Sequence, residues 1–410
     1  MEDRISTRTA FLKAAMLIIA VTAVVYANSL RNSFVWDDAV VIERNDFIRS
    51  VKNLPSLFNR AYLTSYNKID SMEFYTNAGS GEESYRPVVT LSYFLDYRIW
   101  KLNPFGYHLT NIFLHIFDVI LLFIFFKLIV KNYRIALLAS LLFALHPVNA
   151  EAVGVISFRE DLLFSLFYLS SLILYIGMEN ASSRRQKALF YAASLVLFLL
   201  ALFSKEMAVS LPLVLILYDY FFVFKQKGKE MLINFRSRYL GHILILLLYL
   251  FTAFYVIGYT SKAITAYPGK SFFTNLLTMP KVFITYLQWL FLPLNIHVTL
   301  PDDPLLIARS LREPAALFSI ALLAFLFIFA VRIRKTSGIV SFAVFWFFLT
   351  LLPVSNIIPI MNYIACRYLY IPAAGFCLVA AIIIYRMKKF AGSTALLVLA
   401  FYFMLIDCLS

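Results

Sequence analysis

The chain has 410 residues, of which 61% are hydrophobic and only 15% are charged. A soluble domain usually carries about 25% charged residues, so this composition excludes an ordinary soluble protein. Apolar runs of about 17–25 residues recur along the whole sequence and are long enough to cross a bilayer. The composition therefore predicts an all-α polytopic membrane protein that lies in a lipid bilayer.

The net charge of +14 has its source in short loops rather than in a basic domain. Twenty of the 37 Lys and Arg residues lie in six segments that together hold only four acidic residues. This asymmetry is the positive-inside pattern of membrane proteins, so the basic excess needs no nucleic acid partner. The same pattern places the N-terminus in the cytoplasm.

Hydropathy and charge together predict about eleven spans, with the C-terminus outside. The first apolar run is interpreted as a retained span because it lacks a clear cleavage site. The spans are 11–27, 108–130, 134–146, 161–178, 188–203, 207–224, 240–258, 315–331, 338–352, 368–385 and 393–409. We treat residues 1–410 as one membrane domain and expect no separate soluble domain.

Two long segments lie on the outer side in this topology. The first, 28–106, is rich in aromatic residues and is expected to fold onto the membrane face, with short helices near Leu54–Phe58 and Val88–Trp100. The second, 259–314, contains the apolar stretch Val282–Leu294. We interpret that stretch as a re-entrant or interface helix, with Pro280 and Pro293 ending it on either side.

Two adjacent carboxylates, Asp37 and Asp38, follow the first span in the stretch Asn32–Asp38. Neighbouring acids repel each other, so such a pair suggests a proton acceptor, a metal ligand or a partner for a cation. The alternative is a solvated turn that caps a helix.

Other polar side chains gather at the outward-facing turns. Because ionisable groups near membrane depth are costly and persist where they pair or function, their convergence predicts a cavity that opens outward. Lys205 and Glu206 could also be a plain ion pair that closes a short turn, and Glu160 is interpreted as a solvated neighbour of Asp161. The group comprises Arg86, His108, Asn111, His115, His146, Glu151, Arg159, Asp161, Lys205, Glu206, Arg367 and Tyr370.

Several of these residues stand in recognisable motifs. They are Trp36-Asp37-Asp38, Tyr85-Arg86-Pro87, the run Gly106 to His115, the run His146 to Val153, Arg159-Glu160-Asp161, Lys205-Glu206, Leu352 to Asn356 and Arg367 to Pro372. In this order they resemble the membrane part of the transmembrane and tetratricopeptide-repeat O-mannosyltransferases. The sequence departs from that pattern at Cys366, where the family usually has Glu. The tetratricopeptide repeats of the family are absent from this sequence, which bears on how an acceptor is presented.

The resemblance implies a GT-C fold glycosyltransferase that takes a sugar from a polyprenyl-phosphate carrier on the non-cytoplasmic face. It implies that the catalytic residue of the first outer loop is Asp37 or Asp38, whose carboxylate would act as the general base in an inverting displacement. Arg86, Arg159, Lys205 and Arg367 are candidates for binding the donor phosphate.

The remaining polar residues are expected to bind or orient the substrate. They are His108, Asn111, His146, Glu151, Asp161, Glu206 and Tyr370. Glu151, Asp161 and Glu206 could orient the cations or hold a divalent metal, and we favour the former. No other cofactor is expected.

The sugar would be mannose or another hexose, and the acceptor hydroxyl would belong to a protein or a glycolipid. The absent repeats favour a bacterial plasma membrane, with the active site facing the periplasm or the exterior. The alternative function is a transporter or flippase for a lipid-linked sugar. Transporters more often show repeated halves around a mid-membrane site, and no internal repeat is visible here.

Overall fold

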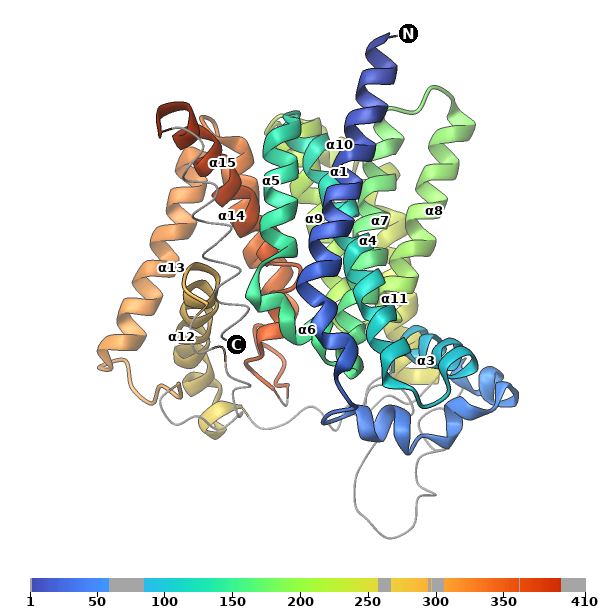
Figure 1. Ribbon diagram of the computed structural model, residues 1–410. Coiled ribbons are helices and arrows are strands. Elements are labelled where there is room, and N and C mark those ends of the chain that lie inside the picture. Colours follow the sequence, from blue (N-terminus) through green and yellow to red (C-terminus); the bar gives the residue numbers. More distant parts are fainter. Residues whose placement is uncertain are drawn as a thin grey trace.

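A computed structural model describes residues 2–58, 85–256, 267–293, 296, 306–360 and 362–391. Within these ranges all regular structure is helical (Figure 1). The α-helices are α1 (Glu2–Tyr26), α3 (Pro87–Trp100), α4 (Pro104–Val130), α5 (Tyr133–Ala144), α6 (Ala150–Gly154), α7 (Arg159–Glu179), α8 (Arg184–Leu202), α9 (Leu211–Tyr218), α10 (Gly228–Ile233), α11 (Phe235–Phe251), α12 (Phe272–Phe291), α13 (Pro314–Ile333), α14 (Gly338–Leu351) and α15 (Ala373–Ala391).

Short 3-10 and π-helical turns join these helices. They are η1 (Ala27–Arg31), η2 (Ala39–Glu43), η3 (Asp46–Arg49), η4 (Val51–Phe58), η5 (Pro147–Asn149), η6 (Ile156–Phe158), η7 (Glu206–Ser210), η8 (Asp219–Val223), η9 (Thr252–Val256), η10 (Pro268–Lys270), η11 (Leu352–Val354) and η12 (Cys366–Leu369).

Seven helical stretches in the described part of the chain are long and apolar enough to cross a membrane, and each overlaps a predicted span. They are Thr9–Arg31, Pro104–Val130, Ile156–Glu179, Arg184–Leu202, Glu206–Val223, Phe235–Tyr255 and Pro314–Ile333. An eighth is a pair bent by 53°, Tyr133–Ala144 with Pro147–Gly154. Gly338–Val354 and Ala373–Met387 are apolar but shorter. The predicted span 393–409 lies outside the described residues, so the total of eleven stays a prediction.

The expected proline boundary at Pro280 is wrong. Helix α12 runs from Phe272 to Phe291 and contains Pro280 in its interior. A proline inside a helix removes one backbone hydrogen bond, but helices in membranes tolerate it because neighbouring helices and side chains compensate. Here α12 packs along α13, which supplies such a neighbour.

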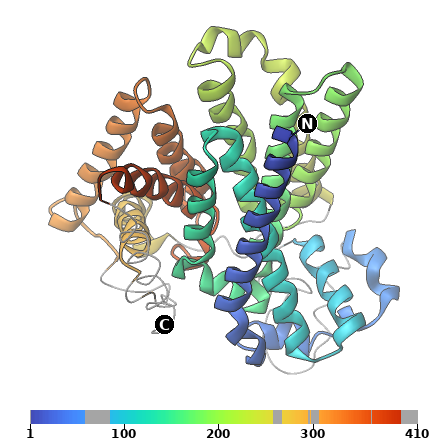
Figure 2. The same ribbon diagram turned by 45° about the horizontal axis from the view of Figure 1, so that its top comes forward.

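The first long loop lies at the end of the bundle opposite the start of α1 (Figure 1). Its short helices and α3 share a second hydrophobic cluster, separate from the main core, that includes Val41, Ile48, Tyr93 and Tyr107. Ile156 and Leu163 join the same cluster from the bundle side. This part of the loop is therefore packed onto the bundle, as the view in Figure 2 also shows.

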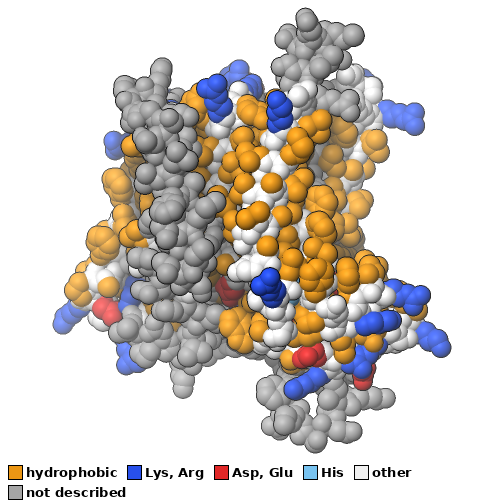
Figure 3. Space-filling model, viewed as in Figure 1, with side chains coloured by type: hydrophobic (Ala, Val, Ile, Leu, Met, Phe, Trp, Pro, Cys, Tyr) orange, Lys and Arg blue, Asp and Glu red, His pale blue; other side chains and the backbone are white. Residues whose placement is uncertain are grey.

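The surface carries the pattern of a membrane protein. Figure 3 shows hydrophobic side chains over the middle of one face, with Lys and Arg side chains near its two ends. Many large apolar side chains are exposed on the helices, among them Leu244, Phe318 and Phe325. Such contiguous exposed apolar surface is unfavourable in water and suits contact with lipid.

The turn between α3 and α4 depends on a glycine. An added Cβ at Gly106 would lie 2.0 Å from Cγ of Trp100, which is too close for any real contact. To relieve the contact, Trp100 would have to adopt another rotamer or the end of α3 would have to move. Gly106 lies in the first turn of α4, the helix that carries His108 and Asn111.

We predict that Gly106→Ala destabilises the protein by about 1–3 kcal/mol, the usual cost of overpacking. The measurement is the thermal unfolding midpoint in detergent. Gly154→Ala is the matched control, because an added Cβ there meets nothing within 4 Å. Equal midpoints for the two variants would contradict the close approach at Trp100.

Candidate active site

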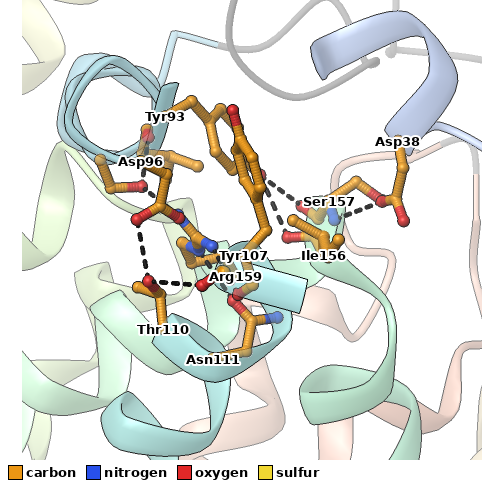
Figure 4. Close-up of polar contacts among 12 residues, drawn as sticks. Asp38, Tyr93, Asp96, Tyr107, Thr110, Asn111, Ile156, Ser157 and Arg159 are labelled. Atoms are coloured by element: carbon orange, nitrogen blue, oxygen red, sulfur yellow. Dashed lines mark hydrogen bonds and ion pairs between the residues drawn. The ribbon is translucent and has the colours of Figure 1, made fainter. Parts of the chain in front are cut away.

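The stretch Asn32–Asp38 is held in place by Asp38. This side chain is fully buried, and its two oxygens accept hydrogen bonds from the backbone N–H groups of Ser157, at 2.6 Å, and Val35, at 3.2 Å. Figure 4 shows Asp38 directed at the turn formed by Ile156 and Ser157, whose carbonyl oxygens accept from the Tyr93 hydroxyl. Asp38 therefore fastens the first loop to the start of α7.

Asp37 lies differently from its neighbour, since it is only half-buried. Partial burial raises the pKa of Asp37, the Arg367 cation lowers it, and the negative charges of Glu160 and Asp38 raise it further, with a net rise. Burial also raises the pKa of Asp38, against the lowering effect of its backbone hydrogen bonds. The two adjacent acids thus have separate environments, and Asp37 is the one that can meet a substrate.

The backbone turns sharply just before these acids. Trp36 has a φ of 48°, a left-handed conformation that costs a non-glycine residue about 1–2 kcal/mol. Its side chain is 56% exposed and lies beside the Phe158 ring. Strained residues of this kind cluster at functional sites, where the surrounding structure holds them in place.

Two cations from separate turns meet the acids at the start of α7. Arg86, just before α3, contacts Glu160 through Nη1 and Glu206 through Nε and Nη2. Lys205, just before η7, lies 2.6 Å from an Asp161 oxygen and 3.3 Å from a Glu160 oxygen. Glu160 therefore lies between two cations and couples them into one network.

A third cation comes from the segment between α14 and α15. Arg367 contacts Glu151 of α6 twice, through its backbone N–H at 2.8 Å and through Nη1 at 3.0 Å. Its guanidinium also lies 4.1 Å from the centre of the Phe158 ring, within the range of a cation–π interaction. Cys366, at the position that departs from the family pattern, is buried, and its thiol donates to the Val148 carbonyl.

Two expectations about this cluster are wrong. Glu160 is not a solvated neighbour of Asp161, because it is 3% exposed and pairs with Arg86 and Lys205. Lys205 and Glu206 do not form a closing ion pair with each other, because each contacts a partner from a different turn. Sequence neighbours point apart at this turn, where Lys205 has an extended backbone.

Arg159 has a different environment from the other cations. It is fully buried, and its guanidinium contacts Asp96 at 2.6 Å, Asn111 at 2.7 Å, the Tyr107 carbonyl at 3.0 Å and Ser92 at 3.2 Å (Figure 4). These contacts join α3, α4 and α7. The geometry leaves no edge of Arg159 facing solvent, which favours a structural role, and the expected contact with a donor phosphate stays a prediction.

Other predicted site residues also form hydrogen bonds inside the protein. His146 accepts from the Val148 N–H through Nδ1, so its Nε2 carries the proton and donates to the Leu290 carbonyl at 3.0 Å. The Tyr370 hydroxyl lies 2.6 Å from Nδ1 of His115 and 2.9 Å from an Asp118 oxygen. Asn111 donates to the carbonyls of Val153 and Val155.

His108 completes this internal group. Its side chain is fully buried beside the backbone of Asn32 and Ser33. Neither ring nitrogen of His108 has a hydrogen-bond partner among the described residues. The side chains of these four residues, His108, Asn111, His146 and Tyr370, are all buried, and their expected role in binding or orienting a substrate stays a prediction.

Sequence reasoning missed the residues that hold the acidic stretch and the cations. Ser157 contributes only a backbone N–H, which no sequence motif reveals. Asp96 lies in an ordinary amphipathic helix, and Phe158 precedes a motif without belonging to it. Within the described residues no group of three or more His, Cys, Asp or Glu side chains is arranged to hold a metal ion. The predicted orienting acids contact cations instead.

We predict that Arg159→Met strongly destabilises the protein, because it leaves Asp96 buried without its cation. Breaking a buried pair by removing one partner typically costs about 3–5 kcal/mol. The thermal midpoint in detergent should fall sharply, whereas Arg184→Met, at an exposed position, should leave it unchanged. A stable Arg159→Met protein with weakened donor binding would instead support a phosphate contact.

Fold and site together define a multi-pass membrane protein with an acid-and-cation cluster at one end of its helices. Its curated relatives carry one common name. A Caenorhabditis elegans protein named Protein O-mannosyl-transferase F38B6.6 is 27% identical over 93% of this chain and 52% of its own length. The human Protein O-mannosyl-transferases TMTC2 and TMTC3 are 33% and 30% identical over 53% and 51% of this chain, or 25% and 22% of their own lengths.

These relatives confirm the resemblance to the O-mannosyltransferases that the motifs indicated. The chain spans about half the length of the worm relative and about a quarter of the human ones. No protein-family model matches the chain, and no solved structure matches it at a significant level.

Proposed function

We propose that this chain is a membrane glycosyltransferase that moves a sugar from a polyprenyl-phosphate carrier to an acceptor hydroxyl. One observation carries the proposal most directly. The half-buried Asp37 lies within electrostatic range of Arg367 and Glu160, so a proton acceptor and a phosphate-binding cluster adjoin each other. The names of the relatives favour mannose as the sugar and a protein as the acceptor.

Asp37 suits the bond that forms, from the acceptor oxygen to the anomeric carbon, and the cations suit the bond that breaks, from that carbon to the phosphate. Asp37 accepts the proton of the incoming hydroxyl as that oxygen bonds to the anomeric carbon. The bond from that carbon to the phosphate oxygen breaks at the same time, and the electron pair leaves with the phosphate. A single displacement inverts the anomeric carbon. Cations near the leaving group stabilise the charge that develops there.

The cluster cations that keep most exposure are Arg86 and Arg367, whose side chains are each 6% exposed. Arg367 is the cation whose charge acts most strongly on Asp37. Arg86 belongs to the same network through Glu160, and Lys205 adds a point charge beneath it. Guanidinium groups bind phosphate oxygens through two parallel hydrogen bonds, which gives the leaving group a fixed orientation.

Asp38 has the role of a positioning residue in this proposal. Its two backbone hydrogen bonds fix the loop, and the fixed loop keeps Asp37 within electrostatic range of Arg367. Because Asp38 is fully buried, it has no surface for a sugar. The proposal therefore assigns proton transfer to Asp37 and placement to Asp38.

The charge asymmetry of the loops supports an N-terminus in the cytoplasm and a site on the opposite, outer face of the membrane. The acidic loop and α3 lie at the end of the bundle opposite the start of α1, in keeping with that proposal (Figure 1). A plasma membrane location would then expose the site to the periplasm or the exterior. The lipid tail of the donor would lie in the bilayer.

We predict that Asp37→Asn lowers the transfer rate by about 10²–10⁴-fold while donor binding is retained, since the amide cannot accept a proton. The assay follows labelled mannose from polyprenyl-phosphate mannose to a Ser/Thr peptide. Asp38→Asn should chiefly lower the thermal midpoint and reduce transfer less. Full transfer by a well-folded Asp37→Asn protein would show that this mechanism is wrong.

The raised pKa of Asp37 gives a pH dependence. The base must be deprotonated, so kcat/KM should fall as the pH drops through the pKa of Asp37. Because that pKa is raised, the fall should begin above the usual aspartate value of about 3.9. The residual activity of Asp37→Asn should lack this acid limb. A wild-type profile that stays flat to about pH 4 would contradict the assignment.

A further inference from the structure

The charge balance of the cluster poses a problem for an anionic donor. Among the described residues, three cations, Arg86, Lys205 and Arg367, are contacted by four carboxylates. Asp37 and Asp38 lie beside them. The cations are thus already compensated, and a phosphate brought to this cluster would meet carboxylates at every cation. For the phosphate to bind, one carboxylate must leave its cation.

The exposure of the four carboxylates singles out one of them. The side chains of Asp161, Glu160 and Glu151 are 1%, 4% and 11% exposed, whereas that of Glu206 is 37% exposed. Moving a buried carboxylate off its cation would leave a buried charge unpaired, which is costly. Glu206 can turn into water, because 37% of its side chain is exposed and Arg86 keeps its pair with Glu160.

Glu206 also occupies the position on Arg86 that a phosphate would use. One oxygen, Oε2, accepts from Nη2 at 2.8 Å and from Nε at 3.3 Å. The edge formed by Nε and Nη2 is one of the two edges through which a guanidinium donates two hydrogen bonds to an oxyanion. The other part of the group, Nη1, is committed to the buried Glu160. Arg86 therefore has one edge that is permanently paired and one edge that can exchange partners.

The backbone allows this exchange without wider rearrangement. The Val88 N–H donates to the Phe203 carbonyl at 3.3 Å, which joins the segment after Arg86 to the segment before Glu206. The Ala208 N–H donates to the Lys205 carbonyl at 3.1 Å and fixes the turn itself. Only the side chain of Glu206 needs to rotate, and the Arg86 edge stays where it is.

We propose that Glu206 is a placeholder for the donor phosphate: its carboxylate covers the Nε and Nη2 edge of Arg86 and is displaced when the phosphate of the lipid carrier binds there. This inference rests on the proposed function and adds a specificity element to it. The carboxylate competes with every anion for Arg86. An anion that contacts Arg86 alone binds no more favourably than the Glu206 carboxylate does. A phosphate that also contacts the other cations binds more favourably and displaces the carboxylate.

The test is binding of farnesyl phosphate, a short isoprenyl monophosphate, to the full chain in detergent by isothermal titration. Glu206→Gln keeps the shape of the side chain and removes its charge. The variant should bind about two- to five-fold more tightly than wild type, because a partly exposed carboxylate no longer competes for Arg86. Glu206→Ala should show the same gain, and the donor KM in the transfer assay should fall with it.

Two further variants separate this role from a merely structural one. Glu230→Gln, a matched change at an exposed glutamate far from the cluster in sequence, should leave binding unchanged. Arg86→Lys, alone or combined with Glu206→Gln, should bind weakly and show no gain from the second change, since lysine lacks the fork. Thermal midpoints measured alongside report whether each variant is folded.

The outcomes distinguish this inference from the function on which it rests. If wild type binds farnesyl phosphate and transfers sugar, but folded Glu206→Gln binds no more tightly, the placeholder is wrong and the enzyme proposal stands. If Glu206 is a plain structural pair, its loss should lower the thermal midpoint without any gain in affinity, which also overturns the inference. If folded wild type neither binds the phosphate nor transfers sugar, both proposals fall together.

Discussion

Arg86 shares its guanidinium between two carboxylates, and the end of the bundle opposite the start of α1 is built around this sharing. Glu160 belongs to α7 and Glu206 to η7, so one side chain before α3 joins three segments that are far apart in sequence. Glu160 in turn contacts Lys205, and Lys205 contacts Asp161. The pairs among Glu160, Lys205 and Asp161 are buried on both sides and cannot be left incomplete, because a single unpaired charge in a medium of low dielectric constant is costly. The network therefore fixes the relative positions of the turns that carry the site.

A second network lies next to the first and has a different purpose. Arg159 joins α3, α4 and α7 through contacts that are fully enclosed by protein. Its neighbour along the chain, Glu160, faces the other network. The dipeptide at the start of α7 thus belongs to two networks, with Arg159 in the fully enclosed one and Glu160 in the one that contains Arg86 and Lys205. Arg86 and Arg159 therefore differ in their contacts although their motif surroundings are similar.

The sequence was sufficient for the helices but not for the partners of the polar side chains. Long apolar runs predict spans because bilayer thickness and the need to satisfy the backbone leave few alternatives. The convergence of Asp37, Arg86, Lys205 and Arg367 was also predictable, since the loop charges place their turns on one side. The contacts that each of these side chains makes could not be predicted from the sequence. Glu160 was misjudged because its exposure depends on Arg86, a residue 74 positions away.

The same limit applies to residues whose motif was recognised correctly. His146 and Tyr370 stand in family motifs, and a motif does not say whether a side chain faces a substrate or the protein interior. Their hydrogen bonds reach Leu290 and Asp118, partners that no local pattern reveals. Pro280 was misplaced for a related reason: a proline weakens a helix locally, but the packing of α12 against α13 determines whether the helix continues.

The twin aspartates illustrate how one pair of identical side chains acquires two roles. The left-handed turn at Trp36 directs the next two residues differently, so Asp38 enters the protein and Asp37 remains at its surface. Asp38 gains backbone hydrogen bonds that offset part of the cost of its burial. Asp37 has Arg367 as the cation that favours its ionised form, and acidic neighbours that oppose it. This balance raises the pKa of Asp37 above that of a free aspartate, which is the direction that its proposed role as a general base requires.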